Sequence, residues 1–488
     1  KQKTAYEISL GLVGSEMCIR DRFKCIALVI LMGFTSSCFE DGDDNVTAGT
    51  SIKDFVWKAM NVVYLYKSNV NDLSNDRFAT NADYQNYLDS NETPETLFEA
   101  LIYDRENVDR FSFITSNYFE LEQQLSGVTL NNGAEFNFYL VPGSTTSVFG
   151  VVRLVHPNSS ASSANLSRGQ VFNKINDISL DSSNLSSLLA NNSYRLGLAT
   201  YDDNNTETFS DDLIIDGNQT VTIVKEGYEE NPIFNATVID INAEKVGYLM
   251  YNSFVNEFDS ELNVIFGDFK SQSIDHLVLD LRYNSGGSVQ TAAALGSMIT
   301  GQFQNQVFTT LKYNETLESN NFDYNFTNTL SNEEIINSLN LDKVYILTSN
   351  RSASASEMMV NSLKSYIEVV QIGGQTVGKS QASQIVYDSP NLGRENANPG
   401  HTYALLPLIA ITVNKNDETV PPSGIVPTVN LLERPAYYGT IGDVEEPLLK
   451  AALQDIQGSN RLAFPSEIEA PPTGLNALNP LETLMYIE

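Results

Sequence analysis

Cysteine, histidine and basic residues are scarce in this chain of 488 residues. The three cysteines all lie in the first 38 residues, which excludes a disulfide framework or a cysteine-ligated metal centre from the rest of the chain. The three histidines, His156, His276 and His401, are far apart, and none has a metal-ligating spacing such as H-E-x-x-H. We therefore expect no metal and no other cofactor. With 61 acidic against 29 basic residues the chain should repel phosphates, which argues against a nucleic-acid partner.

The N-terminal region has the pattern of an export signal. Residues 23–38 combine Lys24 with a short apolar run, small residues and Cys38, and Arg20 and Arg22 lie just upstream. This pattern resembles the lipobox of bacterial lipoproteins. The resemblance implies lipidation of Cys38 and an anchor in the outer membrane of the cell envelope, periplasmic or surface-exposed. A plain secretory signal cut near Ser37 is the alternative. Residues 39–50 predict an acidic tether, and residues 1–22 resemble translated adapter sequence and are left out of the fold prediction.

Apolar periodicity predicts a helical module over residues 51–118. A first helix is expected after Ser51 as its cap, and a second begins with Pro94 in its first turn. Residues 119–228 change to short alternating runs separated by turn residues, which predicts a β-rich domain. The chain should therefore divide into several domains, as chains of this length usually do.

Strands and helices alternate over residues 229–458, which predicts an α/β domain with a mostly parallel sheet. The expected strands are 245–251, 276–281 and 344–347, and the expected helices are 289–299 and 358–367. Residues 459–488 form a proline-rich tail in which the sequence offers no structural signal.

Residues 166–177 resemble a characteristic stretch of PDZ domains, L-x-x-G-D-x-I-x-x-I-N-G. Gln170 replaces the usual Asp, and Asp177 replaces the usual Gly. PDZ domains bind an extended peptide by adding it to a sheet edge, so the resemblance implies polypeptide partners. The alternative is a small β domain with a tight turn at Gly169.

Three loops of the α/β domain follow predicted strands, where open α/β sheets place their sites. They span residues 280–287, 350–358 and 373–379. Each has an ordinary explanation when taken alone. Ser354 and Glu357 fit a helix capping box, Gly286 and Gly287 fit a turn, and Lys379 fits a solvated side chain.

Taken together, the loops resemble those of the C-terminal processing peptidases, also called tail-specific proteases. The motif S-A-S-A-S-E and a following G-K correspond to Ser354 and Lys379, and D-L-R-x-N-x-G-G corresponds to residues 280–287. Residues 109–113 and 422–427 also resemble segments of this family. The resemblance implies that Ser354 is the nucleophile and Lys379 the general base.

The same resemblance implies the accessory residues of the site. The N–H groups of Ala355 and of Gly286 or Gly287 would form the oxyanion hole. Many relatives carry a Gln four residues after the Lys, where this chain has Ser. We therefore expect Gln384 or Glu357 to orient Lys379.

A lysine can act as a base only when it is neutral. Moving its pKa from about 10.4 to near 7 costs on the order of 4–5 kcal/mol, which burial can supply. We expect an apolar pocket that excludes carboxylates, with Val377 as part of its wall. The sequence thus predicts a serine endopeptidase acting on secreted or envelope polypeptides through an acyl-enzyme. The alternatives are a catalytically inactive peptide-binding relative and a glycan-binding surface lipoprotein.

Overall fold

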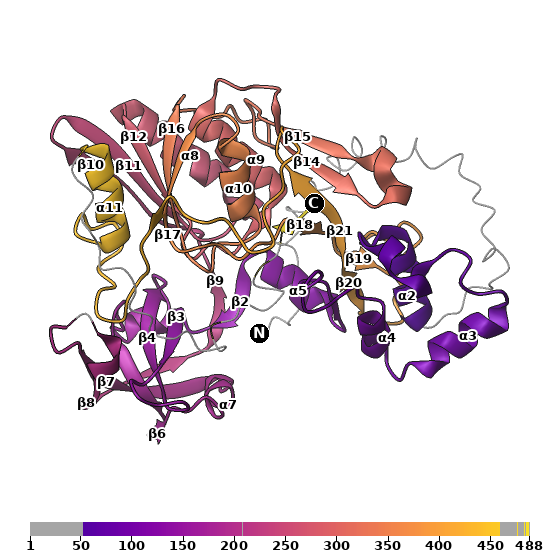
Figure 1. Ribbon diagram of the computed structural model, residues 1–488, viewed down its shortest axis with the longest axis horizontal. Helices are drawn as coiled ribbons and strands as arrows, with labels where there is room; N and C mark the ends of the chain where they lie inside the picture. Colours follow the sequence, from indigo (N-terminus) through magenta and orange to yellow (C-terminus); the bar gives the residue numbers. More distant parts are fainter. Residues whose placement is uncertain (1–51, 207, 459–475, 477–482, 484, 488) are drawn as a thin grey trace, which may run out of the picture. The chain divides into compact units, whose positions relative to one another are not determined.

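The computed structural model describes residues 52–206, 208–458, 476, 483 and 485–487 (Figure 1). The predicted signal peptide, the Ser51 cap and Cys38 fall outside these residues. Of the described residues, 52–74 and those from 88 onwards belong to one compact unit, whereas residues 75–87 belong to another, in which the Phe78 ring contacts Tyr84 and Tyr87. Within the described residues, no helix has both the length and the apolar character needed to cross a membrane.

The predicted helical module is present. Helix α2 buries Phe55, Val56 and Met60 along one side, as the periodicity predicts. Helix α4 begins at Pro94, and the Thr93 hydroxyl accepts a hydrogen bond from the Thr96 N–H (3.2 Å), which caps the helix. The helices are α2 Ile52–Val63, α3 Asn81–Ser90 and α4 Pro94–Ala100. Strand β1 Phe113–Thr115 then joins β20 Ala404–Leu406 and β19 Val386–Tyr387 in a small sheet.

A β-rich domain follows helix α5 Tyr118–Leu125. Two antiparallel strands, β2 Val128–Asn131 and β9 Glu226–Glu229, stand at its entrance and exit. Between them runs a sheet in the order β3-β4-β5-β7-β8, with β6 paired to β5. Its elements are β3 Ala134–Leu140, β4 Val148–Val155, α6 Ser160–Ser163, β5 Val171–Ile175, β6 Ile178–Ser179, α7 Leu185–Leu189, β7 Ser193–Asp202 and β8 Leu213–Val224.

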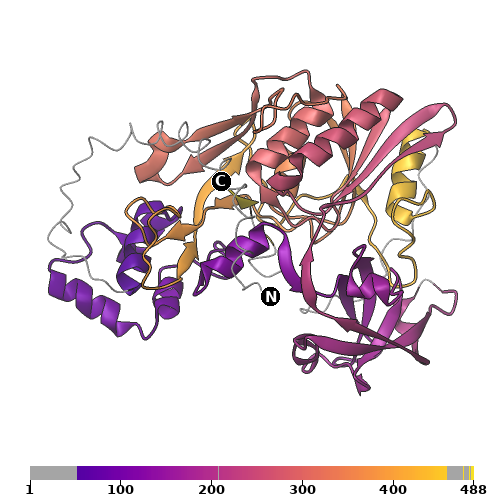
Figure 2. The ribbon, with the colours of Figure 1, turned by 180° about the vertical axis from the view of Figure 1, so that it is seen from behind.

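The main sheet of the α/β domain has the order β10-β11-β12-β16-β17-β22, and it is parallel from β11 onwards. The strands are β10 Ile233–Ile241, β11 Glu244–Tyr251, β12 His276–Asp280, β16 Lys343–Thr348, β17 Glu368–Gly373 and β22 Val429–Asn430. Helices α8 Asp259–Gln272, α9 Val289–Thr300 and α10 Ala355–Leu363 pack on one face, and α11 Pro447–Ile456 packs on the other (Figures 1 and 2). The mostly parallel sheet agrees with the prediction. Helix α10, however, begins at Ala355 rather than at residue 358.

A second sheet of this domain was not predicted. Its order is β13-β23-β18-β21-β14-β15, and it mixes parallel and antiparallel pairs. The strands are β13 Gly287–Ser288, β14 Val307–Tyr313, β15 Phe322–Asn325, β18 Gln381–Ser383, β21 Leu408–Val413 and β23 Met485–Tyr486. Strand β23 comes from the C-terminal segment in which the sequence offers no structural signal.

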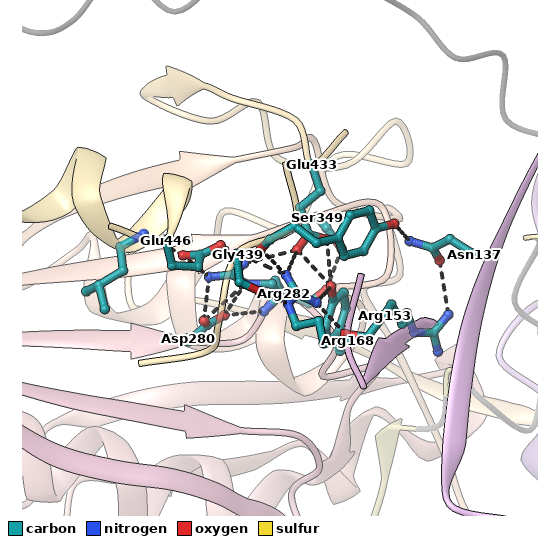
Figure 3. Close-up of polar contacts among 12 residues, drawn as sticks. Asn137, Arg153, Arg168, Asp280, Arg282, Ser349, Glu433, Gly439 and Glu446 are labelled. Atoms are coloured by element: carbon teal, nitrogen blue, oxygen red, sulfur yellow. Dashed lines mark hydrogen bonds and ion pairs between the residues drawn. The ribbon is translucent and has the colours of Figure 1, made fainter. Parts of the chain in front are cut away.

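A buried ionic network holds the loop after β12 in place (Figure 3). The Arg282 side chain is fully buried and binds both Asp280 and Glu446. Arg168 of the β-rich domain joins the network by donating to Glu433 (2.5 Å). Burial opposes ionisation of Glu433, but the charges of Arg168 and Arg282 prevail and lower its pKa to about 2. The network therefore connects the β-rich domain to the loop 280–287 through charged groups.

Candidate active site

Ser354 lies at the turn between β16 and α10, directly before the first residue of the helix. Its backbone has φ 64° and ψ −118°, a region that costs a residue with a side chain roughly 1–3 kcal/mol. The side chain is fully buried. Strained backbone of this kind concentrates at functional sites because it aims one side chain in a fixed direction. The conformation supports a functional role for this hydroxyl beyond that of an ordinary helix cap.

Glu357 connects the Ser354 turn to the Lys379 loop. One carboxylate oxygen accepts from the N–H groups of Ser354 (2.9 Å) and Lys379 (2.8 Å). The other accepts from the Thr376 hydroxyl (2.5 Å) and the Gly378 N–H (2.7 Å). Burial raises the pKa of this carboxyl, and the four hydrogen bonds act in the opposite direction. Glu357 therefore fixes the backbone of both loops.

Lys379 is fully buried, with its amine 4.9 Å from the centre of the Phe111 ring. Desolvation lowers its pKa to about 7, although the charges of Asp109 and Glu357 act to raise it. The expectation that carboxylates are excluded is therefore wrong, because burial outweighs two of them. The apolar neighbour is the ring of Phe111, whereas Val377 is only half-buried.

The helical module supplies residues to the Lys379 loop that sequence reasoning missed. Besides Phe111, the Arg110 guanidinium donates to the carbonyls of Val377 (3.4 Å), Gly378 (3.3 Å) and Pro422 (3.4 Å). The only signal was the resemblance of residues 109–113 to a family segment, which carries no information about what the segment contacts.

The Lys379 loop also interlocks with the turn at residues 422–424. A side chain at Gly378, where φ is +88°, would meet the Pro422 carbonyl at 2.1 Å. A side chain at Gly424, where φ is +87°, would meet the Thr376 carbonyl at 1.9 Å. Both positions therefore require glycine, which explains why the two motifs occur together.

A single carbonyl oxygen joins the two predicted catalytic groups. The Thr483 carbonyl accepts from Ser354 Oγ (2.9 Å) and from Lys379 Nζ (2.8 Å). The fold thus brings together two residues that are 25 positions apart in sequence, one buried hydroxyl and one amine of lowered pKa.

Two segments of the chain match known domain families. The pattern of peptidase family S41 matches residues 245–394, and the peptidase S41 N-terminal domain matches residues 51–113. Both segments of the chain therefore match domains of peptidase family S41. A crystal structure of an S41 protease from Bacteroides fragilis aligns with a TM-score of 0.66 and 26% identity, covering 83% of this chain and 97% of that one. The predicted fold class is confirmed.

Two curated relatives match a smaller part of the chain. A carboxyl-terminal-processing protease of Picosynechococcus sp. is 24% identical over 239 residues, which is 48% of this chain and 50% of the relative. A CtpA-like serine protease of Staphylococcus epidermidis is 28% identical over 171 residues, or 33% of this chain and 32% of the relative. The chain therefore spans about half or less of the length of these relatives.

The predicted oxyanion-hole residues of the S41 domain differ in how their N–H groups are used. The Gly286 N–H donates to Asn284 Oδ1 (2.9 Å), so it is already engaged. Gly287 has φ +132°, and a side chain there would meet the Phe254 carbonyl at 2.2 Å. Ala355 occupies the first position of α10, where no intrahelical carbonyl is available to its N–H. Because the Gly286 N–H is engaged by Asn284, Gly287 and Ala355 remain as the candidates.

The two residues proposed to orient Lys379 differ in their exposure and in their contacts with it. Gln384 is exposed, whereas the Lys379 side chain is fully buried. Glu357 accepts a hydrogen bond from the backbone N–H of Lys379. It therefore positions the residue but does not bind the side-chain amine of Lys379. The amide of Gln381 donates to the Tyr66 hydroxyl (3.0 Å).

One cluster in the described part of the chain has metal-ligand chemistry. Ligand atoms of Glu135, His156 and Glu230 lie within 4.8 Å of one another. Glu135 is already bound by Arg153 (2.6 Å) and by His156 (2.8 Å). The cation that pairs with the cluster is therefore the Arg153 guanidinium, which neutralises Glu135 as in a buried ion pair. Glu135 and His156 belong to the β-rich domain, and Glu230 directly follows strand β9 at its exit.

Proposed function

We propose that this protein is a serine endopeptidase of the C-terminal processing type, with Ser354 as nucleophile and Lys379 as general base. The observation that supports it best is the buried Lys379 amine, with a pKa of about 7, hydrogen-bonded to the same oxygen as the Ser354 hydroxyl. A lysine at its ordinary pKa could not accept the proton of a serine near neutral pH. The match to peptidase family S41 supports serine-type peptidase activity independently.

In the proposed reaction neutral Lys379 removes the Ser354 proton while Oγ attacks the scissile carbonyl carbon. The N–H groups of Gly287 and Ala355 would receive the developing oxyanion. Lys379 then transfers its proton to the leaving amine, and an acyl group remains on Ser354. Water activated by the same amine hydrolyses this ester and restores the enzyme.

We also propose how the substrate is selected and where the protein works. The β-rich domain has the PDZ-like sequence at residues 166–177, and its capture of a substrate's C-terminal residues by strand addition would select polypeptides with accessible ends. Lipidation at Cys38 would hold the enzyme at the bacterial cell envelope, so its substrates would be secreted or envelope proteins.

A serine-directed phosphonate probe and peptide turnover test the mechanism together. Ser354→Ala should abolish both labelling and turnover. Lys379→Ala and Lys379→Arg should leave the fold intact and reduce both severely, because a guanidinium stays protonated. Lys364→Ala is the matched control, since Lys364 lies just after α10 with a side chain 41% exposed. Full activity in Lys379→Ala would refute the mechanism.

A further inference from the structure

Residues of the chain itself occupy the predicted site as an added strand. Strand β23 lies between β13 and β18 and is parallel to both, with Met485 opposite Gly287 and Tyr486 opposite Ser288 and Ser383. The Ile487 N–H extends the pairing by donating to the Ser383 carbonyl (3.1 Å). Its neighbours β13 and β18 belong to the two loops that carry Gly287 and follow Lys379. The segment therefore fills the space between the predicted oxyanion residues and the predicted base.

The segment is held by burial as well as by backbone pairing. The Met485 side chain is completely buried and belongs to the main hydrophobic core, which also contains Ala355 and Ala382. Thr483 is 2% exposed. A cavity lined by Tyr486, Gly286 and Gly287 continues towards Gly127, Thr129, Glu230 and Pro232, next to the strands that lead into and out of the β-rich domain. An extended chain could therefore run further along the same path.

The orientation of the Thr483 carbonyl distinguishes an inhibitor from a substrate. Its oxygen accepts from both Ser354 Oγ and Lys379 Nζ. In a productive complex the oxygen would face the N–H groups of Gly287 and Ala355, and the carbon would face Oγ. Here the hydroxyl proton is directed at Thr483 instead of at the base. The segment thus occupies both catalytic groups without presenting a bond for attack.

We propose that the segment carrying Thr483 and residues 485–487 is an internal competitive inhibitor of the peptidase, a conclusion that rests on the proposed function. The strand position that they fill is also the one in which an extended, unfolded polypeptide substrate binds. The pocket of Met485 then selects a large apolar side chain two residues after the carbonyl that lies at Ser354. Substrates compete with the segment, and they gain access when it leaves the sheet.

The test compares the full chain with variants that release the segment. Met485→Asp places a charge in the buried pocket and should raise kcat/KM on short peptides about tenfold or more, given the stabilisation that burial of a Met provides. Ile487→Pro removes the N–H that bonds Ser383, and serves as the milder variant should Met485→Asp fold poorly. Ile335→Asp is the control, because that side chain is 77% exposed and should tolerate the charge without a change in rate.

A synthetic peptide of residues 479–488 supplies the second measurement. It should inhibit the released variants competitively and remain intact by mass spectrometry, and the same peptide with Asp in place of Met485 should not inhibit. Unchanged kcat/KM in both variants, or cleavage of the peptide after Thr483, would overturn the inhibitor assignment alone. Absence of both probe labelling and turnover in every variant would instead refute the proposed function.

Discussion

Replacing Glu357 by Gln tests whether this carboxylate positions the two loops. Each of its oxygens accepts two hydrogen bonds from buried donors. A glutamine amide presents one oxygen and one NH2 group, so two donors lose their acceptor whichever way the amide turns. A buried donor left unpaired costs about 1–3 kcal/mol. We therefore expect the free energy of unfolding to fall by roughly 2–6 kcal/mol.

The same substitution also changes the pKa of Lys379, and this effect can be measured separately from the loss of stability. The negative charge of Glu357 raises the pKa of Lys379. Its removal should lower that pKa below about 7, which moves the rising limb of the pH–rate profile to lower pH. The plateau rate should fall, because the loops that carry Ser354 and Lys379 lose their common support.

Chemical denaturation and the pH dependence of probe labelling measure the two effects. Glu418→Gln is the matched control, because its side chain is 55% exposed. An unchanged unfolding free energy in Glu357→Gln would refute the hydrogen-bond argument. A pH midpoint that stays in place or moves upward would refute the electrostatic one.

Three further predictions follow from other parts of the chain. Phe111→Ala should admit water to the Lys379 amine and raise its pKa, which moves the pH midpoint of labelling upward. The control Phe111→Leu should keep a midpoint near that of the wild type. A downward move in Phe111→Ala would contradict the desolvation argument. Amidating or extending the C-terminus of a polypeptide substrate should slow its cleavage if the β-rich domain captures that end, and equal rates would count against capture. Cys38→Ser should shift the protein from the membrane to the soluble fraction after export, whereas unchanged partition would reject lipidation.

The parts of the fold that could be predicted are those with a strong local pattern. The apolar runs at 276–281 and 344–347 became buried central strands, and the run at 289–299 became helix α9. The second sheet was missed because β13 and β18 span only two and three residues, too few for a periodic pattern. Its pairing also depends on contacts between distant parts of the chain, which sequence patterns do not encode.

The candidate site also has parts that could be predicted from the sequence and parts that could not. Ser354 and Lys379 could be named from motif spacing, because the chemistry requires those residue types. The contact of Phe111 with Lys379 and the position of Thr483 could not be predicted, since both arise only when distant segments pack together. The lowered pKa of Lys379 followed from physical reasoning, but its neighbouring carboxylates did not.

The buried Arg282 has a consequence for how this protein is made. Its partner Glu446 lies 164 positions later in the chain. A ribosome adding about 5–20 residues per second needs roughly 8–33 seconds to cover that interval. Until Glu446 emerges, Arg282 has its neighbour Asp280 but lacks one of its buried carboxylate partners, so closing the core around it would leave part of the guanidinium unpaired, which is unfavourable. The network around Arg282 is therefore complete only after Glu446, the residue that caps helix α11, has been made. A nascent chain that holds strands β11, β12 and β16 exposes their apolar faces meanwhile, which is the interval in which a chaperone or an export factor would bind it.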